Sequence, residues 1–338
     1  MDAKIRVINE KMRNIYDSNC ETQFSRNLKN QVLDEIEQDI REYSKGFFSK
    51  SLLSLTSIVP FGSFPSNISK LTSDLDILLI IEKTGVKEEE QKYNSASGFG
   101  KQRKNKILKF VAEELCRNRG VYRNIMHIDA AKVPIVRGFK NDVQFDISVH
   151  FGKNMPGCCI ATRYINTVIQ FYPDFPMLHN FLKSWLATLP TQKPNSYSLS
   201  LLLIHFLETQ QYIPKLHKSY SRFFAPEKAT WDLSPLIPQN VSDLWKSRNR
   251  KSPAELFIDF LFYFKFHPIA NKIIDMKLGN VRNKKERSFA GLFIIDPFDP
   301  RNPGRTMRDT LEFQKTLNET LDMIMQFNGD PQCLFSGL

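Results

Sequence analysis

The sequence lacks any long hydrophobic run. In its 338 residues no stretch reaches the roughly 18 uninterrupted apolar residues that a membrane-spanning helix needs. Residues 1–13 are charged, so they do not resemble the apolar core of a secretion signal. We therefore expect a cytoplasmic protein, with the nucleus as the alternative location, and no membrane partner.

Cysteine is also scarce and is not arranged in metal-binding pairs. None of the five cysteines forms a C-x-x-C pair, so the sequence predicts neither a disulfide framework nor a zinc site. The six histidines show no ligand spacing, and we interpret them as ordinary fold or surface residues. No internal repeat or low-complexity tail is present.

Acidic side chains are outnumbered by basic ones. The chain has 47 Lys and Arg against 36 Asp and Glu, a formal net charge of +11. A polyanion such as nucleic acid is therefore the expected partner. The hydrophobic content of 41% is ordinary for a soluble protein, and the length favours two folded units.

Apolar periodicity divides the chain into helical and strand-rich parts. Residues 1–45 predict two amphipathic helices that pack with the second domain. Short β-rich runs follow at 57–61, 75–81, 125–129, 132–139 and 143–150, the last two forming a hairpin turned at 140–142. Helical patterns then predominate, at 158–171, 176–187, 197–211, 253–266 and 305–327. We predict an α+β protein in which a mixed sheet with helices on one face is followed by a mainly helical domain.

The most informative segment runs from Ser73 to Ile80, Ser-Asp-Leu-Asp-Ile-Leu-Leu-Ile. Because strand side chains alternate, Asp74 and Asp76 point to one face and the apolar residues between them to the other. Unpaired carboxylates on an apolar strand resist burial unless a dication neutralises them. Asp146 lies in a second alternating strand, so three carboxylates converge if the two strands are neighbours.

The dipeptide Gly62-Ser63 stands eleven residues before Asp74. Glycine lets backbone N–H groups approach phosphate oxygens and serine adds a hydroxyl donor, so this loop predicts a triphosphate site. Magnesium suits such a site, with manganese as a substitute. Two-metal phosphoryl transfer is then expected, with Asp74 and Asp76 bridging both metals. Asp146 would serve the metal that activates the attacking hydroxyl, and is a candidate proton acceptor. The alternative for the D-x-D pair is an ordinary structural role.

These residues together resemble the non-canonical poly(A) polymerase and terminal uridylyltransferase family, in the DNA polymerase β-like nucleotidyltransferase superfamily. The resemblance implies a catalytic domain over residues 49–154 and a helical central, PAP-associated domain over 1–48 and 155–338, with ATP or UTP in the cleft between them. It also implies template-independent addition of ribonucleotides to the 3′ end of single-stranded RNA. Tailing of messenger or small RNAs in turnover or silencing is the family expectation.

Further motifs imply which residues contact the nucleotide. Asn166 and Thr167 resemble an asparagine-threonine helix in which asparagine meets the ribose 2′-hydroxyl and threonine the base or sugar. Lys183 is similar to a lysine that grips the triphosphate. Ser196 and Tyr197 are similar to a pair in which serine holds phosphate and tyrosine stacks on the base. For each of these, an ordinary surface role is the alternative.

Residues 294–306 resemble the nucleotide-recognition motif, an acidic D-P-F loop leading to N-x-G-R at a helix start. The resemblance implies contacts from Asp296, Asn302 and Arg305. Uridylyltransferases of this type often place histidine before the asparagine, where this chain has Arg301 in a slightly shorter loop. Arginine can bond uracil O4 or guanine O6 and N7, or can contact RNA phosphate or point to solvent. We expect UTP first, with mixed UTP and GTP tails, or ATP, as alternatives.

A second departure lies after Gly62-Ser63, where relatives usually have another glycine and this chain has Asn67. Asparagine is the next-best residue at positive φ, so we expect the loop to keep its shape.

Contact with RNA is predicted from basic clusters at 101–106, 246–251 and 277–287, for which a solvated surface is the alternative. No RNA-recognition-motif or zinc-knuckle signature appears, so a partner protein is expected to select the RNA.

A rival interpretation of the function is a second-messenger synthetase of the oligoadenylate or cyclic-dinucleotide type, against which the D-P-F…N-x-G-R segment argues. A non-catalytic RNA-binding platform is the other rival, and the three intact aspartates argue against it.

Overall fold

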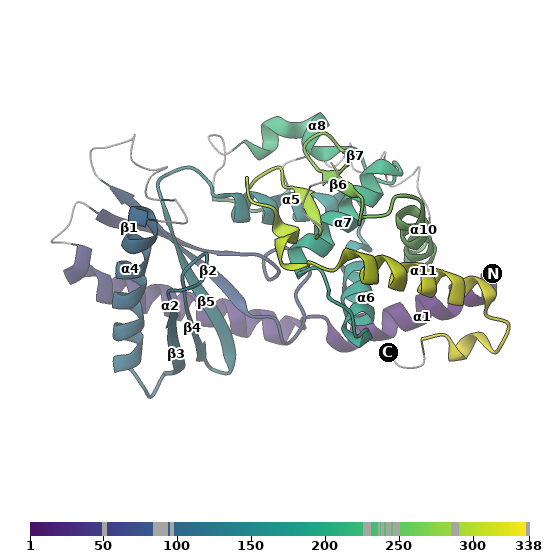
Figure 1. Ribbon diagram of the computed structural model, residues 1–338. Coiled ribbons are helices and arrows are strands. Elements are labelled where there is room, and N and C mark those ends of the chain that lie inside the picture. Colours follow the sequence, from purple (N-terminus) through teal and green to yellow (C-terminus); the bar gives the residue numbers. More distant parts are fainter. Residues whose placement is uncertain are drawn as a thin grey trace. The chain divides into compact units, whose positions relative to one another are not determined.

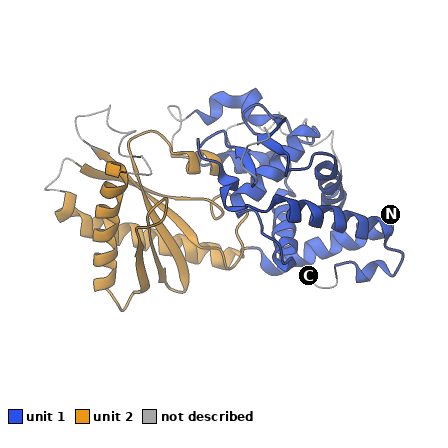
Figure 2. Ribbon diagram, in the orientation of Figure 1, with its two compact units in different colours: residues 1–20, 163–228, 233–338 blue, residues 21–162, 229–232 orange. Residues whose placement is uncertain are grey.

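The chain folds into two compact units. The computed structural model describes residues 1–48, 53–83, 94, 98–225, 231–235, 237, 240, 245, 251–284 and 291–335. Residues 21–162 and 229–232 form the sheet unit, and residues 1–20, 163–228 and 233–338 form the helical unit (Figure 2). Among the described residues no helix is both long and apolar enough to cross a membrane.

The sheet unit is built on one mixed five-stranded sheet. Its strands are β1 (Leu53–Phe61), β2 (Leu75–Lys83), β3 (Tyr122–Ile128), β4 (Ile135–Lys140) and β5 (Val143–Phe151). In space the order is β1-β2-β5-β4-β3, with β2 and β5 parallel and the other neighbouring pairs antiparallel. The helices α2 (Gln23–Phe48) and α4 (Gly98–Arg117) pack on one face of this sheet (Figure 1).

Alternation along the central strands separates the core from the polar face. Leu75, Ile77 and Leu79 of β2 are buried in the hydrophobic core beneath the two helices. Their neighbours in sequence point to the other face, where Asp76 is the partner of Asp146 in the parallel register of β2 and β5. The predicted alternation and the mixed sheet are confirmed.

The hairpin between β4 and β5 was predicted correctly at residues 140–142. Lys140 pairs with Val143, which leaves a two-residue turn of Asn141 and Asp142 with φ angles of 49° and 61°. Positive φ at both central residues is the geometry of a type I′ turn, whose twist matches that of the flanking strands. The turn therefore fixes the register of β4 against β5.

The helix α2 belongs to the sheet unit. Its apolar stripe, Val32, Leu33, Ile36 and Ile40, is buried in the core of the sheet. The expected division instead placed residues 1–48 with the helical domain and began the catalytic domain at residue 49. An amphipathic pattern states that a helix face is buried but not which surface it meets, so only the fold could assign α2.

The helical unit consists mainly of α1 (Asp2–Asn19), the part of α5 (Gly157–Phe171) from residue 163, α6 (Phe175–Thr188), α7 (Ser196–Thr209), α10 (Pro253–Phe266) and α11 (Thr310–Gln326). Shorter helices are α8 (Leu216–Tyr220), η1 (Ser221–Phe224), η3 (Pro303–Thr306) and η4 (Pro331–Cys333). The helix α7 is buried on every side from residue 198 to 208, as its largely apolar sequence requires, and α1 packs against α6 and α10. The mixed fold thus agrees with the predicted α+β class.

A small three-stranded sheet in the helical unit was not predicted. It has the order β7-β6-β8, formed by β7 (Asn280–Asn283), β6 (Lys272–Asp275) and β8 (Phe293–Ile295). Strands of three or four residues are too short to show a clear two-residue period. The sheet matters because β8 leads directly into residues 296–306.

Candidate active site

Three carboxylates converge on the polar face of the sheet unit. Asp76 and Asp146 are register partners on adjacent strands, and Asp74 precedes β2 by one residue. Each of the three offers an oxygen within 4.8 Å of the others, and Asp146 is only 8% exposed. The convergence predicted from the sequence is therefore present, and we call these residues the acidic cluster.

Burial and mutual repulsion give the acidic cluster unusual electrostatics. The pKa of Asp76 is raised to about 7, first by burial and then by the charges of Asp74 and Asp146, while Arg137 opposes the rise. A carboxylate held this way gains strongly from a nearby cation. The oxygen-only donor set is what magnesium and manganese prefer, so the residues fit a hard dication. In the described part of the chain, no other group of acidic, histidine and cysteine side chains has this arrangement.

Arg137 is part of the site and was missed by the sequence reasoning. Its Nε donates to Asp146 Oδ1 at 2.8 Å and its Nη2 to Oδ2 at 2.6 Å, so the guanidinium grips both oxygens. Arg137 is the register partner of Asp146 on β4. The signal was available, because a two-residue turn at 141–142 places these two residues opposite each other.

The loop before the acidic cluster requires its glycine. Gly62 has φ +78°, and a Cβ there would lie 2.7 Å from Asp76 Oδ2, so no side chain fits. The Gly62 N–H donates to Thr162 Oγ1 at 2.8 Å, which means that this donor is engaged within the protein. Ser63 follows with an intermediate exposure. The Gly-Ser dipeptide therefore lies directly beside Asp76, as a phosphate-binding loop must.

Residues 62–73, here called the 62–73 loop, are closed by short-range hydrogen bonds. The Ser66 hydroxyl donates to Gly62 O at 2.5 Å, and Ser73 Oγ accepts from Lys70 N at 2.9 Å. Asn67 has φ +55°, which confirms that asparagine takes the left-handed conformation expected where relatives have glycine. Ser73 therefore shapes the base of the loop immediately before Asp74.

In the helical unit, the two candidate residues on α5 are buried. Thr167 is fully buried and its hydroxyl donates to Arg163 O at 2.9 Å, one turn back in the helix. The Asn166 side chain donates to Leu233 O at 2.8 Å. Both side chains thus contribute to packing around α5 in this structure.

Lys183, Ser196 and Tyr197 have different surroundings. Lys183 on α6 is partly exposed, and Ser196 is exposed at the first residue of α7. Tyr197 is partly exposed, and its hydroxyl interacts with the buried Asp296. The structure therefore links Tyr197 to the loop at 294–306.

The recognition loop, residues 294–306, is held by its own polar side chains. Asn302 Oδ1 accepts from Ile294 N at 3.0 Å and Gly304 N at 2.9 Å, and its Nδ2 donates to Leu292 O at 2.8 Å. Asp296 accepts from Phe298 N at 2.8 Å. Burial raises the pKa of Asp296, and this hydrogen bond opposes the rise. Asn302 and Asp296 therefore determine the shape of the loop.

The side chain of Arg301 is paired within the same loop. Its Nε lies 2.8 Å and 3.0 Å from the two oxygens of Asp299, and Nη2 bonds the second oxygen as well. Burial acts to raise the pKa of Asp299, yet the pKa lies below its ordinary value because Arg301 and Arg305 favour the carboxylate. Arg305 is exposed and donates to Asn302 O at 3.1 Å. Arg301, the candidate for selecting the base, is thus held by a bidentate ion pair with Asp299.

Phe298 is a second residue that sequence reasoning left unassigned. Its ring makes contacts with Tyr164 at 5.2 Å, His217 at 5.8 Å and Phe224 at 6.0 Å between centroids. Such an aromatic cluster anchors the loop to the helices beneath it. The phenylalanine of the D-P-F motif therefore has a packing role.

The basic clusters are only partly within the described residues. Residues 246–250 and the pair Lys285 and Arg287 lie outside them. On α4, a groove of about 850 Å³ is lined by Lys106, Lys109 and Arg117, with His127 of β3 on its other side. Of the three predicted basic clusters, only the first contributes a basic residue to this groove, Lys106, since Lys109 and Arg117 lie outside all three.

Known proteins resemble this chain along most of its length. Residues 8–156 match the family model described as poly(A) RNA polymerase, mitochondrial-like, central palm domain. Protein HESO1 of Arabidopsis thaliana is 26% identical over 285 residues, which cover 74% of this chain and 52% of that protein. Terminal uridylyltransferase 7 of Homo sapiens is 23% identical over 289 residues, 80% of this chain and 18% of its own length. The chain thus spans about half of one relative and under a fifth of the other.

Solved structures share the fold. The crystal structure of mtPAP in complex with UTP has a TM-score of 0.72 and 20% identity, covering 95% of this chain and 69% of that one. Cid1, described as an RNA terminal uridylyl transferase, has a TM-score of 0.68 and 17% identity, covering 97% of this chain and 96% of its own. The palm-domain match contains the 62–73 loop and the whole acidic cluster, so residues 8–156 are similar to the palm domain of the non-canonical poly(A) polymerase and terminal uridylyltransferase family.

Proposed function

We propose that this chain is a template-independent RNA 3′-terminal nucleotidyltransferase that uses UTP in preference to other nucleotides. The observation that carries the proposal is the acidic cluster beside the Gly62-Ser63 loop. Three carboxylates next to a phosphate-binding loop suit transfer of a nucleotidyl group better than any binding role, because binding alone does not require buried charges that repel each other. The names of the relatives, among them Poly(A) RNA polymerase GLD2 of Homo sapiens, support the same chemistry.

Asp74, Asp76 and Asp146 are the residues that would hold magnesium, for which manganese can substitute. When bound, two such ions lower the pKa of the attacking 3′-hydroxyl and neutralise charge on the triphosphate and the leaving pyrophosphate. Arg137 keeps Asp146 ionised and oriented by gripping both of its oxygens. Asp76 must lose its proton to act as a ligand, and its raised pKa makes the site sensitive to pH near 7.

The choice of base is proposed to lie with the recognition loop. Structures of mtPAP are known with GTP, UTP, CTP and ATPγS, so this fold as a whole accommodates every base. Selectivity must then come from side chains particular to each chain. Here Arg301 is paired with Asp299, and an arginine in this position is a donor suited to a carbonyl acceptor such as uracil O4. Mixed UTP and GTP tails, or ATP, are the alternative outcomes.

RNA is proposed to contact the sheet unit through the basic groove on α4. Lys106, Lys109 and Arg117 supply positive charge for a phosphate backbone, although Glu113 and Asp129 also line the groove and Lys109 and Arg117 pair with acidic residues of the same helix. Selection among RNAs is assigned to a partner protein. The structure of a GLD-2/RNP-8 complex, in which a protein of similar fold is bound to a second protein, supports a protein partner for this chain. A cytoplasmic location, with the nucleus as the alternative, accompanies the proposal.

The test is extension of a labelled single-stranded RNA with magnesium, using each nucleoside triphosphate alone and then all four together. Extension by the wild type that is lost in the Asp74→Ala, Asp76→Ala double variant supports the proposal, and the tail sequence reports the preferred base. Short oligonucleotides made without an RNA primer would point to a second-messenger synthetase instead. Failure of the folded wild type to bind magnesium and nucleotide would overturn the proposal.

A further inference from the structure

A buried ion cluster that includes none of the three aspartates lies at the start of α2. Glu21 Oε1 is 2.7 Å from Lys29 Nζ, and both side chains are only 3% exposed. Arg26 approaches the other oxygen of Glu21 at 3.2 Å. Removing one partner from a buried ion pair leaves an uncompensated charge, so the three side chains are energetically interdependent.

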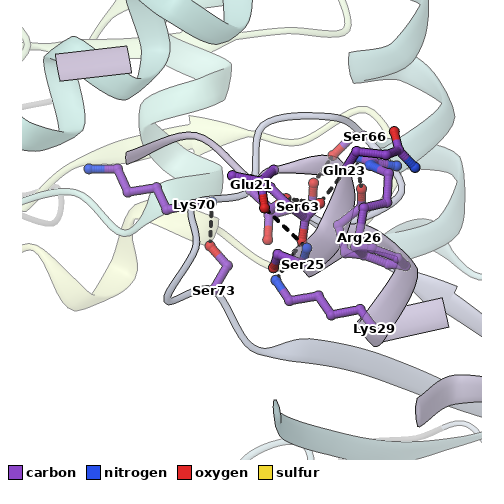
Figure 3. A network of polar contacts seen from close by, with 12 residues as sticks. Glu21, Gln23, Ser25, Arg26, Lys29, Ser63, Ser66, Lys70 and Ser73 are labelled. Atoms are coloured by element: carbon purple, nitrogen blue, oxygen red, sulfur yellow. Dashed lines mark hydrogen bonds and ion pairs between the residues drawn. The ribbon is translucent and has the colours of Figure 1, made fainter. Parts of the chain in front are cut away.

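The ion cluster is connected to the 62–73 loop at two points. The Ser69 hydroxyl donates to Glu21 Oε2 at 2.8 Å, and Glu21 N donates to Ser69 O at 3.4 Å. Arg26 Nη2 donates to Phe64 O at 3.2 Å. Figure 3 shows Glu21, Arg26 and Lys29 gathered around the serines of this loop.

An aromatic ring strengthens the connection. The buried ring of Phe64 lies 5.2 Å from the guanidinium carbon of Arg26 and 5.7 Å from Lys29 Nζ, within the range of cation–π attraction. Phe64 follows Ser63 directly. The cluster therefore holds the residue next to the Gly-Ser dipeptide by its ring and by its carbonyl.

The two ends of the loop are closed by the bonds from Ser66 to Gly62 and from Lys70 to Ser73, whereas the bonds in its middle are longer. Its internal hydrogen bonds include Ile68 N to Ser63 O at 3.3 Å and Asn67 N to Phe64 O at 3.4 Å, both long. The middle of the loop is therefore held less firmly by its own bonds than its ends, and an anchor from outside the loop would fix the middle in one geometry. Glu21 is placed to be this anchor, because it contacts Ser69 directly and the Phe64 carbonyl through Arg26.

We propose that Glu21 is a positioning residue for the nucleotide: with Lys29 and Arg26 it holds the 62–73 loop in its phosphate-binding form. The inference rests on the proposed function of that loop. Asp76 is held independently of the anchor by the pairing of β2 with β1 and β5. Loss of the anchor therefore weakens nucleotide binding while the chemical step is largely retained.

The test compares two charge-balanced double variants of the full chain in RNA extension. Glu21→Gln with Lys29→Met removes the buried pair without leaving a lone charge. It is expected to raise the KM for the nucleotide about 10-fold while kcat changes less than about 3-fold. The control, Glu37→Gln with Arg41→Met, removes an exposed ion pair on the same helix and leaves both constants unchanged. Ser69→Ala, which keeps every charge, should raise KM about 3-fold.

Amide hydrogen exchange of residues 62–73, measured without nucleotide, tests the positioning role of Glu21 separately from the proposed transferase function. Faster exchange in the Glu21→Gln, Lys29→Met and Ser69→Ala variants supports the anchor even if the wild type has no transferase activity, in which case only the proposed function fails. The positioning role is overturned if the folded variants show unchanged exchange in this loop, or if KM stays within 2-fold of an active wild type.

Discussion

The 62–73 loop with its acidic cluster and the recognition loop at 294–306 both match motifs of one family, yet they use their polar side chains differently. Beside the first loop, Asp74, Asp76 and Asp146 converge with Arg137 as the cation among them. In the second loop, Asp296 and Asn302 bond the loop's own backbone. The carboxylates of the acidic cluster repel each other, and a bound cation would reduce that repulsion. The polar side chains of the recognition loop are instead hydrogen-bonded to the loop itself.

The same contrast between repelled and hydrogen-bonded acidic side chains is seen in two buried carboxyl groups, Asp76 and Glu208. The pKa of Asp76 and that of Glu208 on α7 both lie at about 7, and burial is the main cause for each. Neighbouring carboxylates raise the pKa of Asp76 further, whereas hydrogen bonds from Tyr164 and Leu216 lower that of Glu208. Similar values therefore arise from an unsatisfied site and from a satisfied one. Only the first has a reason to bind a metal.

The largest expected effect comes from removing charge at the acidic cluster. Asp74→Asn with Asp76→Asn should lower RNA extension about 1000-fold or more, since both metal ligands are lost. The same variant should be more stable without metal, by about 1 kcal/mol, because repulsion is removed. Extension assays and thermal unfolding test the two parts. The control is Asp34→Asn with Glu42→Gln, which removes two exposed charges from α2. An equal loss of activity in the control variant would show that the effect is not specific to the acidic cluster.

The second prediction concerns Glu208, whose folded-state pKa lies above the ordinary value of 4.5. The folded protein then binds this proton more tightly than the unfolded chain, so the free energy of unfolding falls as pH rises from about 4.5 to about 7. Glu208→Gln keeps an oxygen acceptor for Tyr164 and Leu216 and should abolish this loss. The free energy of unfolding of the variant minus that of the wild type should therefore be larger at pH 8 than at pH 4.5, by at most about 3 kcal/mol. Denaturant unfolding at both pH values measures it, and a pH-independent difference would contradict the assignment.

A smaller effect on stability and nucleotide affinity is expected at the recognition loop, whose polar side chains are already hydrogen-bonded. Asn302→Ala removes three hydrogen bonds and should lower the free energy of unfolding by about 2 kcal/mol. Nucleotide affinity should fall with it, because the loop loses its shape. Asn14→Ala, at an exposed position of α1, is the matched control. If Asn302→Ala lost affinity while keeping full stability, Asn302 would be a nucleotide ligand and the contrast between the loops would disappear.

The smallest effect is expected at Asp299 and Arg301, which are both partly exposed. Because the two side chains act as one pair, Asp299→Ala and Arg301→Ala should weaken UTP binding alike, by about 1 kcal/mol each, and the double variant by no more. Tail composition from mixed nucleotides gives the second measurement. A change in base choice with Arg301→Ala alone would show that the arginine reads the base by itself.

The face on which each carboxylate lies was predictable because it depends on local rules, whereas the pairing of β2 with β5, which brings Asp146 to Asp76, could be stated from the sequence only as a condition. Alternation placed Asp74 and Asp76 on one face, and the two-residue turn fixed β4 against β5. The same rules would have found Arg137 opposite Asp146. By contrast, the burial of Thr167 depends on packing that its motif does not describe. Arg301 pairs with Asp299 inside its own motif, but the motif alone did not state this pairing and suggested a ligand contact instead.

The sequence by itself determined the strands, the helices, the face on which the carboxylates lie and the positive φ that Asn67 adopts, because these follow from periodicity and backbone sterics. Only the tertiary structure decided that α2 covers the sheet, that Glu21 reaches Ser69 and that Phe298 is enclosed by aromatic rings. These contacts join segments far apart in the chain. Their energies come from burial and charge pairing between particular surfaces, which no local pattern specifies.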